Sequence, residues 1–351
     1  MRTAFARCHR LRSWVIAYNP RVLARAAAWL DRAAFNPSSL PDDLNTGIAL
    51  APPVAAGLII FKLPALEMLA IALAFGIGAQ LLARWLWRKD IPRPQASPLI
   101  AAVFGIALVG AGASLFTSIV IAALAVTLEL LRARLIPAIR AQPGLLAFAA
   151  VALIARNAPL GPLAYINPAT GRKFPDPIAI WYLQPALPAP YDPITLWVGN
   201  VAGPVFATSL MAVVVGIAWL AYARRLSLVV AVGFLVGAVV AVALYHWDAM
   251  TQLDSGPTWF VAGLLLADRR LLPGSWALRP VLGLGAGLIA LGLRVRGFGI
   301  EAAFLTVAGA QAVMAVVVMV LWAASLGTER WKKTRRLRRR QAQLRVVKPA
   351  S

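Results

Sequence analysis

The stretch 300-IEAAFLTVAGAQAVMAVVVMVLWAAS-325 decides the fold class of this chain, and it contains a single charged residue, Glu301. About 20 consecutive apolar residues cross the hydrocarbon core of a bilayer as one helix. In lipid, an isolated segment can satisfy all its backbone hydrogen bonds only as a helix. The stretch therefore predicts a membrane-spanning helix.

Nine further apolar windows precede this stretch, and some are interrupted by Gly and Pro, as in 51-APPVAAG-57 and 199-GNVAGPV-205. Such breaks are tolerated at membrane depth only where neighbouring groups satisfy the freed backbone, so we expect the broken segments inside the bundle. The sequence predicts an all-α polytopic membrane protein of about ten transmembrane helices in two five-helix repeats. The ten windows lie near 46–61, 65–86, 97–113, 115–131, 142–157, 195–222, 227–246, 257–268, 280–295 and 300–325.

The composition agrees with this fold class. Of the 351 residues, 60% are hydrophobic and 14% are charged, and the mean hydropathy is +0.74, which is more apolar surface than one soluble core can bury. The net charge of +22 does not indicate a nucleic-acid partner, because the basic residues cluster between the apolar windows. One cysteine, Cys8, excludes an intramolecular disulfide, and with two histidines, His9 and His246, it makes no metal site.

The Lys and Arg residues give an orientation. With both termini inside, 29 of the 35 basic residues lie on the inner side of the ten-span arrangement. This asymmetry favours a multi-pass protein of the bacterial inner (cytoplasmic) membrane with both termini in the cytoplasm. The outer six are Lys62, Arg156, Arg172, Lys173, Arg294 and Arg296.

Five parts follow from this orientation. They are a cytoplasmic basic amphipathic arm (1–45), a first five-helix repeat (46–157), an extracytoplasmic loop (158–194), a second five-helix repeat (195–325) and a cytoplasmic basic tail (326–351). We expect the basic arm and tail to contact anionic lipid. A dedicated binding site on the tail is the alternative.

Three stretches carry a resemblance to a known family. They are 165-YINPA-169, the glycine-rich start of 197-WVGNVAGPVFATSLMAVVVGIAWLAYARR-225, and 255-SGPT-258 followed by WFVAGLLLAD. The pattern, spread over most of 45–325, resembles the NqrB/RnfD family, the membrane subunits of sodium-pumping NADH:quinone oxidoreductases and of Rnf complexes. In that family the threonine of the S-G-A-T segment carries FMN through a phosphoester. The resemblance therefore implies covalent FMN on Thr258, and it leaves room for a second flavin.

The local chemistry of Asp254-Ser255-Gly256-Pro257-Thr258 suits this role. Proline is well placed in the first turn of a helix, and glycine lets the backbone approach a ligand closely. The N–H groups at a helix start favour a phosphate. The alternative is that these residues are an ordinary helix cap.

The chain also departs from the family pattern. Pro257 stands where the family has alanine, Asp268 is followed by Arg269 rather than proline, and Ala207 replaces an acidic residue of the glycine-rich span. Intramembrane carboxylates usually mark ion paths, so we expect turnover with little sodium dependence. The acids that remain in or beside the spans are Glu67, Glu129 and Glu301.

Two of these acids have a basic neighbour on the same helix or turn. We predict that Glu129 pairs with Arg132 and that Glu301 pairs with Arg296, and a functional role is the alternative for each. His246 lies in 245-YHWD-248 and is expected at the outer interface, either as an anchor or in contact with the flavin ring.

The expected function is electron transfer between redox partners, with a quinone among the acceptors considered. The chain has no nucleotide fingerprint and no ligand set for haem or Fe–S clusters, so it is expected to be one subunit of an oxidoreductase complex rather than a complete enzyme. A relative without ion pumping, acting beside other redox enzymes in a natural-product pathway of the enediyne type, fits the departures. The rivals are a channel or transporter and a membrane anchor for soluble subunits.

Overall fold

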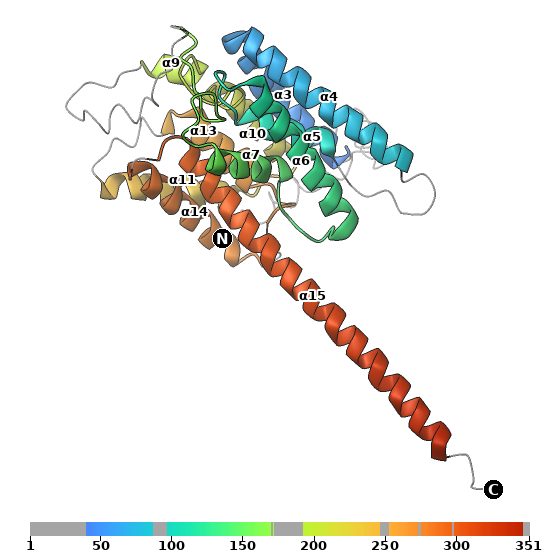
Figure 1. Cartoon of the computed structure of the whole chain (residues 1–351). Helices are drawn as coiled ribbons and strands as arrows, with labels where there is room; N and C mark the ends of the chain where they lie inside the picture. Colours follow the sequence, from blue (N-terminus) through green and yellow to red (C-terminus); the bar gives the residue numbers. More distant parts are fainter. Residues whose placement is uncertain are drawn as a thin grey trace, which may run out of the picture.

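The computed structural model describes residues 40–86, 97–169, 171, 192–245, 253–272, 275–296 and 298–346, and of 325–346 it describes the backbone alone. Within these ranges the chain forms helices and no β-strand, so the all-α prediction is confirmed (Figure 1). The helices are α3 (Asp42–Phe61), α4 (Leu63–Leu86), α5 (Pro98–Ala107), α6 (Leu115–Leu135), α7 (Pro143–Ile154), α9 (Pro193–Val198), α10 (Leu210–Tyr222), α11 (Leu228–Leu244), α13 (Gly256–Trp259), the π-helix η2 (Phe260–Leu266), α14 (Leu278–Val295) and α15 (Glu301–Val346).

Helix length divides these elements into two groups. Five helices are long enough and apolar enough to cross a membrane, namely α3, α4, α6, α14 and the Glu301–Ala324 part of α15. Other helices are apolar but shorter, namely α5, α7, α10, α11 and the run Gly256–Leu266 formed by α13 and η2. Each apolar window of the sequence thus contains a helix, and the long ones are those of a membrane protein.

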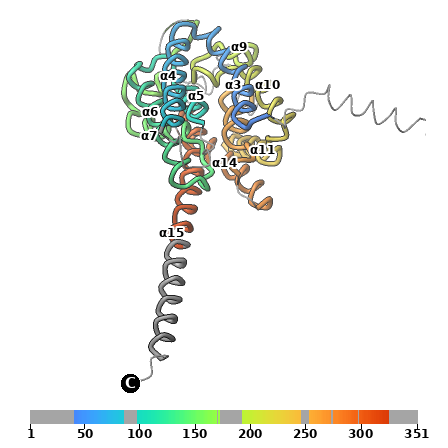
Figure 2. Tube along the Cα trace, turned by 90° about the vertical axis from the view of Figure 1, so that its right-hand side faces the viewer, coloured from blue at the N-terminus to red at the C-terminus, as the bar shows by residue number. Residues whose placement is uncertain are grey.

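The helices form two groups in space. Figure 2 shows α4 to α7 on one side and α9, α10, α11 and α14 on the other, with α15 emerging between them. Helix α3 packs chiefly on α10, so the first helix among the described residues lies against the second group. Helix α15 contacts both α7 and α14 and so connects the groups.

Two unwound segments meet inside the bundle. Helix α5 ends at Ala107, and α9 and α10 are separated by 199–209. The amide of Val205 donates to the carbonyl of Val109 at 2.9 Å, and that of Phe206 donates to the carbonyl of Ala107 at 3.2 Å. Residues 101–111 and 201–210 are all buried. The expectation that the break in 199–205 lies inside the bundle is therefore confirmed, because each segment satisfies backbone groups of the other.

The second expected break is absent. Helix α3 runs without interruption through Pro52 and Pro53. A proline frees the carbonyl four residues before it, which for Pro53 is that of Ala49. That carbonyl lies against Gly216 of α10, where an added Cβ would come within 2.2 Å of it. The prediction of a break at 51–57 was wrong, because the prolines weaken the hydrogen-bond ladder without ending the helix.

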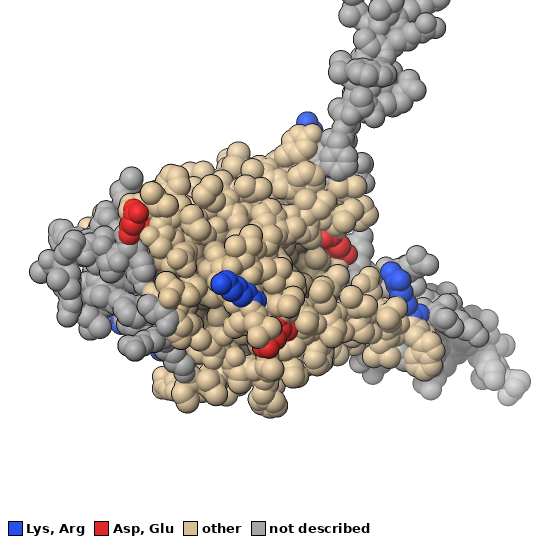
Figure 3. Space-filling model, turned by 90° about the horizontal axis from the view of Figure 1, so that it is seen from above, with Lys and Arg blue, Asp and Glu red and all other residues tan. Residues whose placement is uncertain are grey.

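Charged side chains are sparse on the face at the end of the molecule where α9 lies. Figure 3 shows a few isolated Lys, Arg, Asp and Glu among uncharged residues over the described part of that face. Large apolar side chains on the flanks are also exposed, among them Ile59, Leu81, Val215 and Val320. Such a flank is stable only against an apolar solvent.

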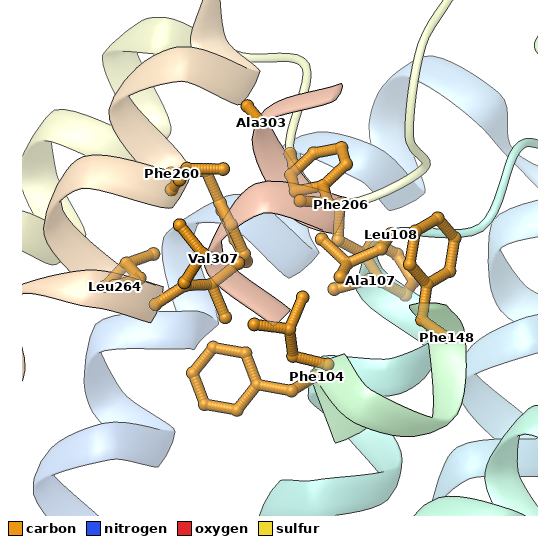
Figure 4. Packing of buried hydrophobic residues seen from close by; sticks show 14 of the residues in the cluster. Phe104, Ala107, Leu108, Phe148, Phe206, Phe260, Leu264, Ala303 and Val307 are labelled. Atoms are coloured by element: carbon orange, nitrogen blue, oxygen red, sulfur yellow. The ribbon is translucent and has the colours of Figure 1, made fainter. Parts of the chain in front are cut away.

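The core lies where the two groups of helices meet (Figure 4). Phe104 of α5 and Phe260 of η2 make an edge-to-face contact with ring centroids 6.2 Å apart. Phe148 of α7 makes a similar contact with Phe304 of α15 at 5.9 Å. Buried aromatic pairs of this geometry add stabilisation beyond their area, so α5 is held by a side chain of η2 and α7 by a side chain of α15.

Glycines allow a close helix contact between α11 and α14. A Cβ at Gly287 would lie 2.1 Å from the carbonyl oxygen of Phe234, and one at Gly283 would lie 2.5 Å from that of Val230. The small residues of 285-GAGLIALG-292 suit close helix packing. Only part of this stretch packs closely, because a Cβ added at Gly285 or Gly292 would meet nothing within 4 Å.

The observed helices begin and end at other residues than the five expected parts of the chain. The basic arm (1–45) lies largely outside the described residues, and α3 already begins at Asp42. Of the loop 158–194, residues 170 and 172–191 lie outside the described residues too. In the described part, the carbonyls of Pro162 and Ala164 accept from the amides of Gly110 and Gly112 at 2.8 and 2.9 Å. Helix α15 continues through most of the tail, to Val346.

Candidate functional site

The S-G-P-T turn begins a helix, as the sequence predicts. Ser255 precedes α13 with φ −84° and ψ 115°, and Pro257 lies in the first turn. The side chain of Ser255 makes no capping hydrogen bond, so the alternative of a side-chain cap is not what forms this turn. Helix α13 passes directly into the π-helix η2 at Phe260, and π-helical turns occur frequently at functional sites.

Two indole groups hold the turn. Trp197 of α9 donates from Nε1 to the Asp254 carboxylate at 2.9 Å, and Trp259 donates from Nε1 to the carbonyl of Leu253 at 2.6 Å. Asp254 therefore fixes the turn to α9 through its side chain. Sequence reasoning did not single out either tryptophan, although Trp197 opens one of the stretches that carry the resemblance.

Gly256 has a packing role that the sequence did not reveal. A Cβ at Gly256 would lie 2.1 Å from the carbonyl oxygen of Thr208 and 2.8 Å from that of Ala207. The close approach expected between Gly256 and a ligand is thus an approach to the backbone that precedes α10. The missing side chain lets the turn and the unwound segment 199–209 lie in contact.

Thr258, two residues after Gly256, is 1% exposed. Its amide donates to the carbonyl of Ser255 at 3.2 Å, and Pro257 has no N–H group. Pro257 and Thr258, two of the first three residues of the helix, therefore offer no free amide to an anion. The turn has fewer free amides than we expected from the sequence. A phosphate at Thr258 would need a donor from outside the turn.

Thr208 is a candidate for that donor. Its side chain is 1% exposed, and its Oγ1 has no hydrogen-bond partner. The neighbouring hydroxyl of Ser209 is not free to donate to a phosphate, because it already donates to the carbonyl of Trp197 at 3.4 Å. From the sequence we considered only Ala207 in this segment, and the adjacent Thr208-Ser209 pair before α10 was the signal that could have found Thr208.

The segment 165-YINPA-169 supports the interior rather than the turn. The Asn167 side chain accepts from the amide of Ala169 at 2.9 Å and closes a local turn. A Cβ at Gly112 would lie 2.7 Å from the Ile166 side chain. The motif therefore packs on the unwound segment that follows α5.

The acids near the spans have structural partners or are exposed. Glu129 accepts from the amide of Ser97 at 2.9 Å and pairs with Arg132 at 2.7 Å, as predicted. This carboxylate thus joins the start of α5 to α6. Glu67 is exposed on α4, and Ala207 is fully buried with no acid in its place.

Glu301 does not pair with Arg296. Its carboxylate lies 3.9 Å from Arg156, which follows α7, and it accepts from the amide of Gly299 at 3.1 Å. The guanidinium of Arg156 lies 4.1 Å from the centre of the Phe298 ring. The prediction was wrong because the turn between α14 and α15 directs Glu301 toward α7, a contact between segments distant in sequence.

A second polar cluster lies at the other ends of α10 and η2. Asp268 is 4% exposed and pairs with Arg270 at 2.7 Å. Arg225 pairs with Asp42 at 3.0 Å, and Arg270 donates to the Thr46 hydroxyl at 2.7 Å. The cluster ties the start of α3 to the two loops that follow α10 and η2.

The electrostatics of the cluster follow from burial and neighbours. Burial is the main cause that lowers the pKa of Arg225, and the positive charge of Arg270 lowers it further. Burial also acts to lower the pKa of Arg270, but the charge and hydrogen bonds of Asp268 outweigh it, so the net shift is upward. The carboxylate of Asp268 therefore stabilises the charged form of Arg270.

The described residues hold no group of three or more His, Cys, Asp or Glu side chains that could bind a metal. His246 lies outside the described residues. No protein-family model matches this chain, and no curated protein matches it.

Proposed function

We propose that this protein is a ten-span membrane flavoprotein that carries FMN on Thr258 and passes electrons between redox partners. The observation that carries the proposal is the S-G-P-T turn itself. It is a polar turn, held by two indoles, at the start of a broken helix in an otherwise apolar bundle. Beside it lies a buried hydroxyl without a partner, that of Thr208.

In the ten-span arrangement, each short helix crosses only part of the membrane. Helix α5 has 10 residues and rises about 15 Å, roughly half of the 30 Å hydrocarbon core. The unwound segment after it continues the crossing, with its backbone hydrogen-bonded to residues within 160–164 and to 205–206. The run Gly256–Leu266 is the corresponding element of the second half, which gives two five-helix repeats.

The charge distribution supports the orientation of this arrangement. Its inner side carries 29 of the 35 basic residues, including those of the Arg225 and Arg270 cluster. We place both termini in the cytoplasm of a bacterium and the Thr258 turn near the outer face of its inner membrane. Anionic lipid contacts the inner basic residues.

The attachment chemistry is a phosphoryl transfer. Thr258 would hold FMN as a phosphoester on its hydroxyl oxygen, with a flavin dinucleotide as the phosphoryl donor, a nucleoside monophosphate as the leaving group and the hydroxyl proton passing to solvent. A flavin transferase catalyses this step. Because Thr258 is 1% exposed, the turn has to open for the transfer, or the transfer precedes its packing against 207–208.

Bound flavin supplies one-electron and two-electron chemistry that the side chains of this protein lack. The chain holds the flavin at one position, excludes water around the turn with apolar neighbours, and fixes the turn through Trp197 and Trp259. Electrons enter and leave through other redox subunits, with a quinone as one acceptor. The protein is accordingly a subunit of an oxidoreductase complex.

The test is the mass and fluorescence of the purified chain, made together with a flavin transferase. We expect an added FMN-phosphoryl mass and a fluorescent band on a denaturing gel. Thr258→Ala removes both, and Thr258→Ser keeps part of the signal because the hydroxyl remains. Thr127→Ala is the matched control, since that threonine bonds the Ala123 carbonyl of its own helix. A wild-type chain without the added mass would reject the proposal.

A channel or transporter is the second candidate. It is favoured by the two unwound segments, 108–114 and 199–209, that meet in the bundle interior, because broken helices commonly surround transport sites. Solute or ion flux through proteoliposomes of the Thr258→Ala variant distinguishes the candidates. A flux that needs no flavin, in a chain that is never flavinylated, supports transport.

A further inference from the structure

The Thr208 hydroxyl is unusual in its surroundings. It is buried, its Oγ1 has no partner, and its methyl carbon is the atom nearest to Gly203, where an added Cβ would lie 2.6 Å from it. A buried hydroxyl without a partner destabilises a protein. A helical threonine usually bonds the carbonyl four residues back, but Thr208 precedes the first residue of α10.

The position of Thr208 relative to the turn is fixed by backbone contact. Its carbonyl oxygen lies against Gly256, two residues before Thr258. The S-G-P-T turn is meanwhile short of donors, because Pro257 has no N–H and the amide of Thr258 donates to Ser255. A buried phosphate needs hydrogen-bond donors. Thr208, whose hydroxyl has no partner, therefore packs through its backbone against a turn that lacks donors.

We infer that Thr208 is a positioning residue for the flavin: its hydroxyl donates a hydrogen bond to the phosphate of the FMN ester on Thr258. This inference rests on the proposed function, since it needs FMN on Thr258. It explains why a hydroxyl is retained at a buried place where the protein alone gives it no partner. The bond holds the ester in one orientation and so fixes the start of the electron path at the turn.

The inference predicts that Thr208→Val changes the melting temperature differently with and without bound flavin. Thr208→Val keeps the shape and the methyl group toward Gly203 but removes the hydroxyl. In the flavin-free Thr258→Ala background it raises the melting temperature or leaves it unchanged, because an unsatisfied polar group is lost. In the flavinylated chain it lowers the melting temperature, because the phosphate loses a donor.

The experiment measures all four combinations of these substitutions in the full chain, with flavin content checked by intact mass. Phosphorus NMR of the flavinylated proteins gives a second readout, since loss of the donor shifts the resonance of the phosphothreonyl ester. Thr208→Ser is the control that keeps the hydroxyl, and it should resemble wild type in both readouts. Thr208→Ala, which is smaller, covers the case in which the valine variant fails to insert.

Three outcomes separate the two claims. Opposite temperature shifts with and without flavin, together with a shifted phosphorus resonance, support the inference. Equal shifts in both backgrounds with an unchanged resonance overturn it while leaving covalent FMN intact. A wild-type chain without added FMN mass overturns the proposed function and this inference together.

Discussion

Gln311 provides the sharpest test of how the broken half of the bundle is held. It lies in the apolar part of α15 and is 4% exposed. Its side-chain oxygen accepts from the amide of Gln142, just before α7, at 2.8 Å. Its side-chain nitrogen donates to the carbonyl of Leu265, near the end of η2, at 3.1 Å. One carboxamide thus satisfies two helix ends that have no partner within their own helices.

Replacing Gln311 by methionine keeps the volume and removes both hydrogen bonds. Interhelical hydrogen bonds in membrane proteins average about 0.6 kcal/mol each, and a buried group left unsatisfied costs about 1–3 kcal/mol. We therefore expect the free energy of unfolding to fall by about 1–4 kcal/mol, with the two lost bonds setting the lower value. The same change should loosen η2, which continues the helix that carries Thr258.

The assay is reversible unfolding in mixed detergent, combined with hydrogen exchange at Gln142. The expected result is a lower unfolding free energy and faster exchange of that amide. Val313→Leu is the control, because Val313 is 65% exposed on the same helix and the change should stay within about 0.5 kcal/mol of wild type. Unchanged stability and exchange in Gln311→Met would refute the argument that this carboxamide holds the two helix ends.

Three further predictions follow from the packing, the charges and the orientation. Gly287→Leu should destabilise the protein by about 1–3 kcal/mol, because its side chain meets the α11 backbone, whereas Gly285→Leu should cost less than about 0.5 kcal/mol; equal effects in an unfolding titration would contradict the glycine contact. Asp268→Asn should lower the pKa of Arg270, since the carboxylate is what raises it, and it should reduce the unfolding free energy by about 1–3 kcal/mol. The control is Asp192→Asn at an exposed position, and equal stability of the two variants would show that the ion pair contributes little. In a chain with Cys8 replaced, an impermeant thiol reagent applied to intact cells should label Ala169→Cys but not Ala138→Cys, both exposed positions, and the reverse pattern would invert the topology.

The sequence by itself determined where helices form and in what solvent. Hydropathy is a local property, so the windows of apolar residues predicted the helices without knowledge of any partner. The turn chemistry of Pro257 and the helix start at Gly256 were local as well. The Glu129–Arg132 pair was predictable for the same reason, because residues three apart share one face of a helix.

Only the tertiary structure decided which face of each helix packs inward. In a soluble protein a polar stripe marks the outer face of a helix, but lipid is as apolar as the core. Val281 is 67% exposed and Ala286 is 5% exposed, yet both are apolar, so the sequence does not show which of them faces inward. The packing of Gly287 rather than Gly285 is one result, and the partner of Glu301 is another. The site depends on the same kind of contact. Thr208 and Gly256 are 48 positions apart in the chain, and their close approach comes from non-local packing of backbone on backbone, which no local pattern of residues encodes.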